Sequence, residues 1–120
     1  MYGLDARIDL SFLRGRELQQ VAVGLYQVQF HFDEDLAICI EGEFRYSDGD
    51  REVLWRQEPN SSSAAASTVA LLGAAIIGFT ASQDGTLRLE FSNGHRLTIF
   101  DSSKDYEPYS ITRPGLYLCV

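Results

Sequence analysis

The chain has 120 residues, which is enough for one domain and too few for two of ordinary size. Hydrophobic residues make up 45% of it and charged residues 22%, which excludes the collagen-like, disulfide-rich and wholly disordered classes. Ten basic and 17 acidic residues leave a net charge of −7, so we expect no nucleic acid and no membrane partner. The charge has two interpretations: general solubility, or an acidic face that meets a basic protein partner.

Cysteine usage and the N-terminal region bear on the cellular compartment. Cys39 lies in an apolar run typical of a buried strand, and Cys119 is the penultimate residue. A buried thiol is the main interpretation for Cys39, and a disulfide between the two cysteines is the alternative. Residues 1–17 carry charges throughout and lack the apolar core of a signal peptide, so we expect a cytoplasmic protein.

One helix is expected near the middle of the chain. The most apolar stretch, 64–77, is shorter than the roughly 20 residues that a membrane-spanning helix needs. The serines at 61–63 precede it and are typical of a helix start. The spacing predicts a helix near 62–72 that packs on a sheet through one stripe of side chains: Ala65, Val69, Leu72 and Ile76.

Elsewhere apolar residues alternate with polar ones, which predicts half-buried strands. The alternation is clearest over 26–32, and shorter stretches follow at 36–40, 44–46, 53–55, 87–91 and 97–99. Pro114 and Gly115 predict a tight turn, after which Leu116, Leu118 and Val120 form a closing strand.

The loop around Asn93 decides the register of one hairpin. A two-residue turn would place Leu97 on the opposite face from Leu89. A three-residue loop from Ser92 to Gly94, with Gly94 in the left-handed region, pairs them instead. We predict the three-residue loop, because it puts the large apolar side chains of both strands on one face.

The hairpin pattern occurs twice in the chain. Five apolar positions recur at one spacing (87 − 28 = 59): Val28, Phe30, Phe32, Ile38 and Ile40 correspond to Leu87, Leu89, Phe91, Leu97 and Ile99. We therefore predict an internal duplication of a helix-plus-hairpin unit, with pseudo-repeats 10–46 and 62–105 in a single domain spanning 1–120. A chance match between alternating patterns is the other interpretation.

No pattern in the sequence predicts catalysis. The two histidines, His31 and His95, are not at equivalent positions of the proposed repeat, and no spacing typical of a zinc or di-iron site occurs. The acidic segment 33–35 lacks the ligand pattern of a calcium loop, so a solvated hairpin tip is the main interpretation and a cation site the alternative. We expect no metal, no cofactor and no enzymatic activity.

The least generic segment contains Asp101, Tyr106, Glu107 and Tyr109, in which aromatic and acidic side chains alternate. Such residues are typical of a pocket rim or a partner-binding loop. The alternative is that the tyrosines pack down and anchor a long loop. Trp55 also has two interpretations, as an exposed interface anchor or as the core residue of a strand.

Two motifs in the last third of the chain support a resemblance. Residues 89–94 form an L-x-F-x-N-G hairpin motif, and Tyr106, Glu107 and Tyr109 follow as a Tyr-Glu-x-Tyr-like segment. In these motifs the chain resembles a family of small bacterial β-rich proteins of unknown function, which implies no established activity. Some similar small acidic β-rich proteins act as immunity partners of bacterial toxins, which by analogy implies a basic protein partner.

Together these patterns predict an α+β domain: a twisted, partly barrel-like antiparallel sheet of about six to eight strands with one helix packed on it. The expected function is a non-catalytic protein-interaction module, immunity-like, that binds a basic partner. The alternative is a small-molecule-binding protein with a pocket near 106–109. Free strand edges also predict a homodimer through an edge or through the C-terminal strand.

Overall fold

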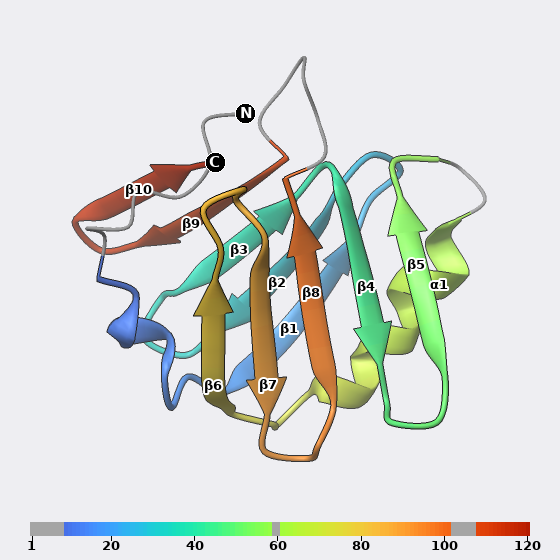
Figure 1. Cartoon of the computed structure of the whole chain (residues 1–120), viewed down its shortest axis with the longest axis horizontal. Helices are drawn as coiled ribbons and strands as arrows, with labels where there is room; N and C mark the ends of the chain where they lie inside the picture. Colours follow the sequence, from blue (N-terminus) through green and yellow to red (C-terminus); the bar gives the residue numbers. More distant parts are fainter. Residues whose placement is uncertain (1–8, 59–60, 102–107) are drawn as a thin grey trace.

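The computed structural model describes residues 9–58, 61–101 and 108–120, which form two antiparallel sheets of five strands each. Figure 1 shows the sheets packed on each other with their strands crossing obliquely. The first sheet has the order β1 (Leu18–Val23), β2 (Val28–Phe32), β3 (Ala37–Ile40), β9 (Tyr109–Arg113), β10 (Leu116–Cys119). The second has the order β5 (Glu52–Arg56), β4 (Glu43–Ser47), β8 (Arg96–Phe100), β7 (Leu87–Phe91), β6 (Ile76–Ala81).

The predicted α+β class with antiparallel strands is confirmed, but the single, partly barrel-like sheet is wrong. The strands divide between two sheets, and no closed barrel forms among the described residues. After β3 the backbone N–H groups of Glu41 and Gly42 both donate to the Pro108 carbonyl (2.9 and 2.8 Å), and the chain passes there to the second sheet. An alternating pattern gives a strand one apolar face, but it does not specify whether a second sheet or the same curled sheet covers that face.

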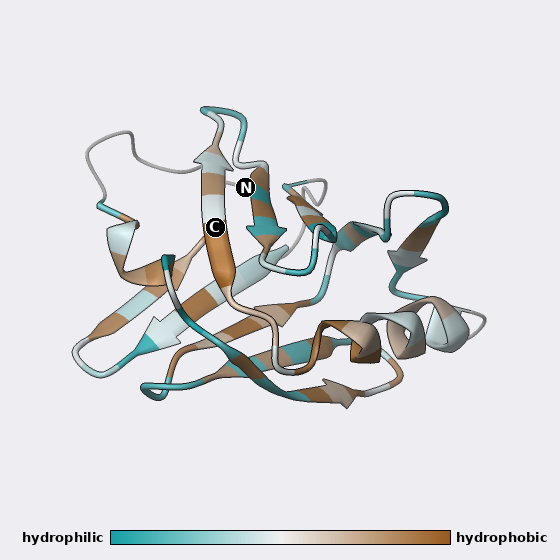
Figure 2. Cartoon of the chain, turned by 90° about the horizontal axis from the view of Figure 1, so that it is seen from below, coloured by the Kyte–Doolittle hydropathy of each residue, from teal (hydrophilic) through white to brown (hydrophobic). Residues whose placement is uncertain are grey.

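Aromatic side chains join the two sheets across the core. Phe30 of β2 meets Phe44 of β4 edge to face, with 5.7 Å between ring centroids. Phe32 of β2 stacks on Phe91 of β7 at 6.5 Å. In Figure 2 apolar and polar residues alternate along the strands, as expected where one face of each sheet is buried. Burying each of these rings stabilises the fold by about 1.5–3 kcal/mol relative to exposure.

The predicted helix near 62–72 consists of α1 (Ser62–Ser67), continued by the 3-10 helix η3 (Thr68–Leu71). Helix α1 contacts β5 and β1, and η3 contacts β1. Since β5 and β1 are edge strands of different sheets, the helical segment covers the open side of the sandwich between them (Figure 1).

The predicted apolar stripe of the helix is wrong at Val69 and Leu72, whereas its other two residues, Ala65 and Ile76, are buried. Ala65, Thr68 and Leu71 are buried, whereas Val69 and Leu72 are 49% and 45% exposed. A 3-10 helix has three residues per turn, so the buried positions recur every third residue instead of at the spacing of an α-helix.

The predicted hairpin register is confirmed. Leu87 pairs with Ile99 and Leu89 with Leu97, and Gly94 has a φ of +87°. The matching hairpin of the first half pairs Phe30 with Ile38, and two non-glycine residues at its tip have φ values of 58° and 57°.

The segments that lead into β1 and β6 form matching hydrogen bonds. The Gly15 N–H donates to the Ile76 carbonyl (2.7 Å), and the N–H of Gly73, at a spacing of 73 − 15 = 58, donates to the Leu18 carbonyl (2.9 Å). Both glycines have positive φ, +87° and +85°, and each follows a 3-10 segment, η1 (Ser11–Leu13) or η3. The two segments therefore form a short antiparallel ladder, the junction ladder, which links edge strand β1 of the first sheet to edge strand β6 of the second.

The correspondence extends to the strand pairs that follow. Phe44 of β4 pairs with Ile99 of β8 on one side and with Trp55 of β5 on the other. Tyr109 is the corresponding residue of the other half, at a spacing of 109 − 44 = 65. It pairs with Ile40 of β3, and its backbone carbonyl accepts a hydrogen bond from the Val120 N–H (3.1 Å). Each sheet thus combines three strands of one half with a strand pair of the other. These contacts support the predicted duplication, which stays a prediction, and they continue beyond residues 46 and 105.

Replacing Gly94 by alanine is expected to lower the free energy of unfolding by about 1–2 kcal/mol, because its φ of +87° is unfavourable for a residue with a side chain. No atom lies within 4 Å of the added Cβ, so the cost comes from the backbone. Gly78→Ala is the control, since its φ lies outside the left-handed region and the new Cβ would lie 3.8 Å from Glu90 Oε2. Urea unfolding compares the two variants, and an equal loss in both would contradict the role assigned to the Gly94 loop.

Candidate functional site

Trp55 and Tyr109, two of the residues that the sequence proposes for binding, lie in the core. Each side chain is 1% exposed, and the Trp55 ring stacks on Phe44 with 5.4 Å between centroids. The Tyr109 hydroxyl donates a hydrogen bond to the Gly85 carbonyl (2.6 Å). Neither ring is available to a partner, which favours the core interpretation of Trp55 and the anchoring interpretation of Tyr109. Tyr106 and Glu107 lie outside the described residues.

Asp101 lies beside the same anchor. Gly85 has a φ of +93°, and a Cβ there would collide with the Asp101 side chain, so this side chain packs directly on the glycine. Burial raises the pKa of Tyr109 above its usual range, and the nearby carboxylates of Asp101 and Asp84 raise it further. The structure brings Asp101 and Tyr109 together at Gly85, where they hold the turn between β6 and β7 against the start of β9.

The outer face of the first sheet is uncharged. The strand register places ten outward side chains in two rows across its five strands. One row is Gln20, His31, Ala37, Thr112 and Tyr117, and the other is Ala22, Gln29, Cys39, Ser110 and Cys119. None of the ten carries a carboxylate, ammonium or guanidinium group, and all are half-buried or exposed. We call these ten residues the neutral face.

The outer face of the second sheet has a different composition. Its outward positions include charged residues on four of its strands: Arg45, Arg56, Arg88, Arg96, Glu43, Glu52 and Glu90. Arg56 Nε lies 3.1 Å from Glu43 Oε1, and the Arg45 guanidinium lies 5.5 Å from the centre of the Phe100 ring. A sheet face in contact with water normally carries such charges, so the neutral face is the exception.

Side chains of the neutral face make hydrogen bonds along and across its strands. His31 Nε2 lies 3.0 Å from Gln29 Oε1, and the Cys39 thiol donates to Gln27 Oε1 (3.3 Å). Burial raises the pKa of Cys39, and the nearby Glu41 carboxylate raises it further, so the thiol is protonated at neutral pH. Neither Cys39 nor Cys119 forms a disulfide in the described part of the chain, so the disulfide alternative is not found.

Acidic residues border the neutral face at the ends of its strands. Glu17 precedes β1, the segment 33–35 (Asp-Glu-Asp) joins β2 to β3, and Glu41 follows β3. We call these five residues the acidic rim. They place negative charge at the ends of β1, β2 and β3, whereas Arg113 lies at the end of β9.

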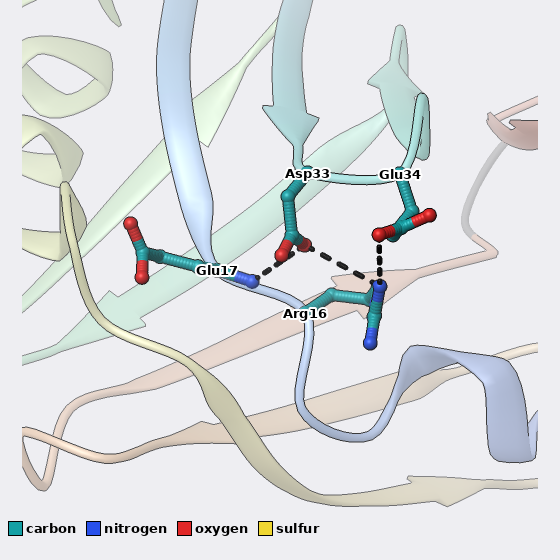
Figure 3. A network of polar contacts seen from close by, with 4 residues as sticks. All are labelled: Arg16, Glu17, Asp33 and Glu34. Atoms are coloured by element: carbon teal, nitrogen blue, oxygen red, sulfur yellow. Dashed lines mark hydrogen bonds and ion pairs between the residues drawn. The ribbon is translucent and has the colours of Figure 1, made fainter.

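One part of the acidic rim is held by hydrogen bonding and charge (Figure 3). Asp33 Oδ1 accepts a hydrogen bond from the Glu17 backbone N–H (3.0 Å). Arg16 approaches the same turn, with 3.7 Å from one of its terminal nitrogens to Asp33 and 3.9 Å to Glu34. The Glu34 side chain remains largely exposed.

Other chemistry in the described ranges is limited. They contain no group of three or more His, Cys, Asp or Glu side chains placed to hold a metal ion. His95 Nδ1 lies 2.6 Å from the Tyr46 hydroxyl, and His31 contacts Gln29. None of the helices in these ranges is long and apolar enough to span a membrane. The expectations of no metal, no cofactor and no catalysis stay predictions.

The neutral face is not recognisable in the sequence, for a reason that the topology explains. The outward residues of each strand are visibly uncharged, as in 27–31 and 110–112, but short uncharged stretches are common. Their meaning depends on β9 and β10 being added to β3, which lies about seventy residues earlier in the chain (109 − 40 = 69).

A family of unknown function (DUF6188) matches residues 10–120 of the chain. The chain belongs to this family. The resemblance noted in the last third is thereby confirmed as far as a β-rich family of unknown function, and the match covers both halves. No curated protein and no solved structure matches the chain.

Replacing Tyr109 by phenylalanine is expected to lower the free energy of unfolding by about 1 kcal/mol, because the Gly85 carbonyl loses its donor. The raised pKa of Tyr109 gives this loss a pH dependence. The folded protein keeps a proton that the unfolded chain releases above about pH 10, so the contribution of Tyr109 is complete below that pH and decreases above it. Urea unfolding should show a smaller difference in the free energy of unfolding between the unmodified protein and Tyr109→Phe at about pH 10.5 than at about pH 7. An equal difference at both pH values would contradict the role assigned to the Tyr109 hydroxyl.

Proposed function

We propose that the protein is a non-catalytic protein-interaction module that binds a protein partner through the neutral face. The observation that carries the proposal is the absence of charge from ten outward positions of the first sheet, while the second sheet carries charges on four of its strands. The centres of protein interfaces are depleted in charged residues, because charges lose hydration there. A charge-free patch on a chain of net charge −7 fits that requirement.

The acidic rim supports a partner with a basic border around an uncharged centre. Five strands about 4.8 Å apart and five residues long cover about 400 Å². This is about half of the ~800 Å² that each partner contributes to a stable interface. The residues around the neutral face must therefore contribute as well, and those in the acidic rim attract basic side chains. A basic partner also fits the immunity-like role expected by analogy with other small acidic β-rich proteins.

A second copy of the chain fits the neutral face less well, because the acidic rims of the two copies would face and repel each other. The predicted homodimer through a strand edge is a separate arrangement and stays a prediction. Strand β10 forms an edge of the first sheet in the described residues, and its Tyr117 is 66% exposed. Pairing through β10 would extend the sheet without covering the neutral face.

The alternative function, small-molecule binding near 106–109, receives no support from Tyr109, because its hydroxyl is already bonded inside the core. Tyr106 and Glu107 lie outside the described residues.

Thr112→Lys tests the proposal by placing one charge in the neutral face, on the exposed side of β9. Thr80→Lys is a matched control, since it makes the same substitution at an exposed position of β6 in the other sheet. We expect a stoichiometric partner from a lysate of the source organism to bind the unmodified chain and the Thr80→Lys variant. Affinity for Thr112→Lys should fall at least about tenfold, because a lysine would be buried without a partner.

Two further results test whether a protein partner binds through the neutral face. Association with the purified partner should slow as the salt concentration rises, because rim charges mainly affect the rate of association. Equal binding by both lysine variants would place the contact elsewhere, and no stoichiometric partner at either low or high salt would contradict the interaction module. Melting temperatures of both variants exclude misfolding as the cause.

A further inference from the structure

A pocket of about 480 Å³ lies where three separate parts of the chain meet. The segment from η1 to β1 contributes Phe12, Arg14 and Arg16, the turn between β2 and β3 contributes Glu34, and the end of β9 contributes Arg113. Leu36 and Pro114 complete its apolar walls. Three arginine residues thus line one hollow in a chain of net charge −7. We call this hollow the arginine pocket.

Two of the three arginines contact aromatic rings. The Arg14 guanidinium lies 5.2 Å from the centre of the Phe79 ring, and that of Arg113 lies 4.7 Å from the centre of Phe12. Among the described residues neither has a carboxylate within ion-pair distance. Contact with a ring face leaves the N–H groups at the edge of a guanidinium free to bind an anion.

Arg16 has hydrogen-bonding capacity to spare. Its distances of 3.7 Å to Asp33 and 3.9 Å to Glu34 are too long for hydrogen bonds (Figure 3). Its Nε is buried and has no hydrogen-bond partner among the described residues. A buried donor without an acceptor is costly, and because Nε is closed to solvent, an anion would bind the terminal nitrogens of Arg16.

The matching junction in the other half shows that a junction ladder forms without arginine at these positions. At a spacing of 58 the positions of Arg14 and Arg16 are taken by Leu72 and Ala74, and the junction ladder forms equally on both sides. At a spacing of 65 the position of Arg113 is taken by Asp48.

The acidic turn shows the same asymmetry. The Ala75 N–H is bonded by the Ser92 hydroxyl (3.0 Å), as the Glu17 N–H is bonded by the Asp33 carboxylate (3.0 Å). An uncharged oxygen is therefore sufficient to hold the strand start. The charges are confined to one of two equivalent places, which indicates a role in binding.

We propose that the arginine pocket binds a small organic monocarboxylate with an apolar body. A guanidinium group offers two parallel N–H donors that match a carboxylate, and the walls formed by Phe12, Leu36 and Pro114 would cover the apolar part of the ligand. The volume falls within the range of about 300–1,000 Å³ typical of small-molecule sites. Glu34 leaves the pocket with a moderate positive charge, which favours a monoanion over a more highly charged phosphate.

The test uses benzoate as the probe, with neutral benzamide and inorganic phosphate as comparisons. Proton–nitrogen NMR spectra report on the backbone and on the Nε–H groups of arginine. Benzoate should cause saturable shifts at Arg16 Nε and around Phe12, with a dissociation constant on the order of millimolar for so small a ligand. Benzamide should cause none, and phosphate should bind more weakly than benzoate.

Substitutions locate the binding within the arginine pocket. Arg14→Gln and Arg113→Gln should each weaken benzoate binding by about tenfold, the value of one charged hydrogen bond. Arg88→Gln is the matched control on the outer face of the second sheet and should leave binding unchanged. Glu34→Gln should strengthen binding several-fold by removing a repelling charge, an effect that a purely structural role of these residues would not produce.

Several results would overturn the proposal: no saturable shift with benzoate, equal binding of benzamide or phosphate, or equal weakening by Arg88→Gln. Melting temperatures of each variant separate loss of the site from loss of the fold. None of these results depends on the neutral face, so failure of one proposal leaves the other intact.

Discussion

The arrangement of the molecule depends on the junction ladder between the segments around Gly15 and Gly73. Each glycine has a positive φ, and each donates its N–H to the strand that the other segment enters. Because these bonds join edge strands β1 and β6, they hold the two sheets together along one side of the sandwich. Helix α1 and η3 cover the side between β1 and β5, and the aromatic contacts fill the space between the sheets.

Because the two halves of the chain are nearly equivalent, residues that the fold requires can be separated from residues that serve another purpose. Whatever both halves share, such as the glycines of the junction ladder and the apolar pairs of the hairpins, is accounted for by folding. A feature that is present in only one half of the chain needs another explanation. Charge is the main such feature: it is missing from the outer face of the first sheet, and arginine is concentrated at one of the two ends of the ladder.

Local parts of the fold were predictable because their determinants lie close together in the chain. The alternation over 87–99 and the glycine at 94 were sufficient to derive the hairpin register, since a shift by one residue would expose every large apolar side chain. The helix was predicted near its observed range, but the exposure of Val69 and Leu72 was not, because the helix changes to 3-10 geometry at Thr68. Trp55 and Tyr109 were ambiguous in the sequence, and burial in the core resolved both.

The sequence by itself therefore determined most of the strands, though not β1, β6 and β9, together with the turns, the net charge of −7 and the spacing between the halves, because each depends on residues in one short stretch or on composition. Only the tertiary structure decided that the strands form two sheets and that each sheet contains three strands of one half and a strand pair of the other. It also decided which side chains share a surface. The neutral face needs the pairing of β3 with β9, and the arginine pocket needs Arg14, Arg16 and Arg113 to meet from opposite ends of the chain. Such contacts arise from long-range packing, which alternation along a strand does not encode.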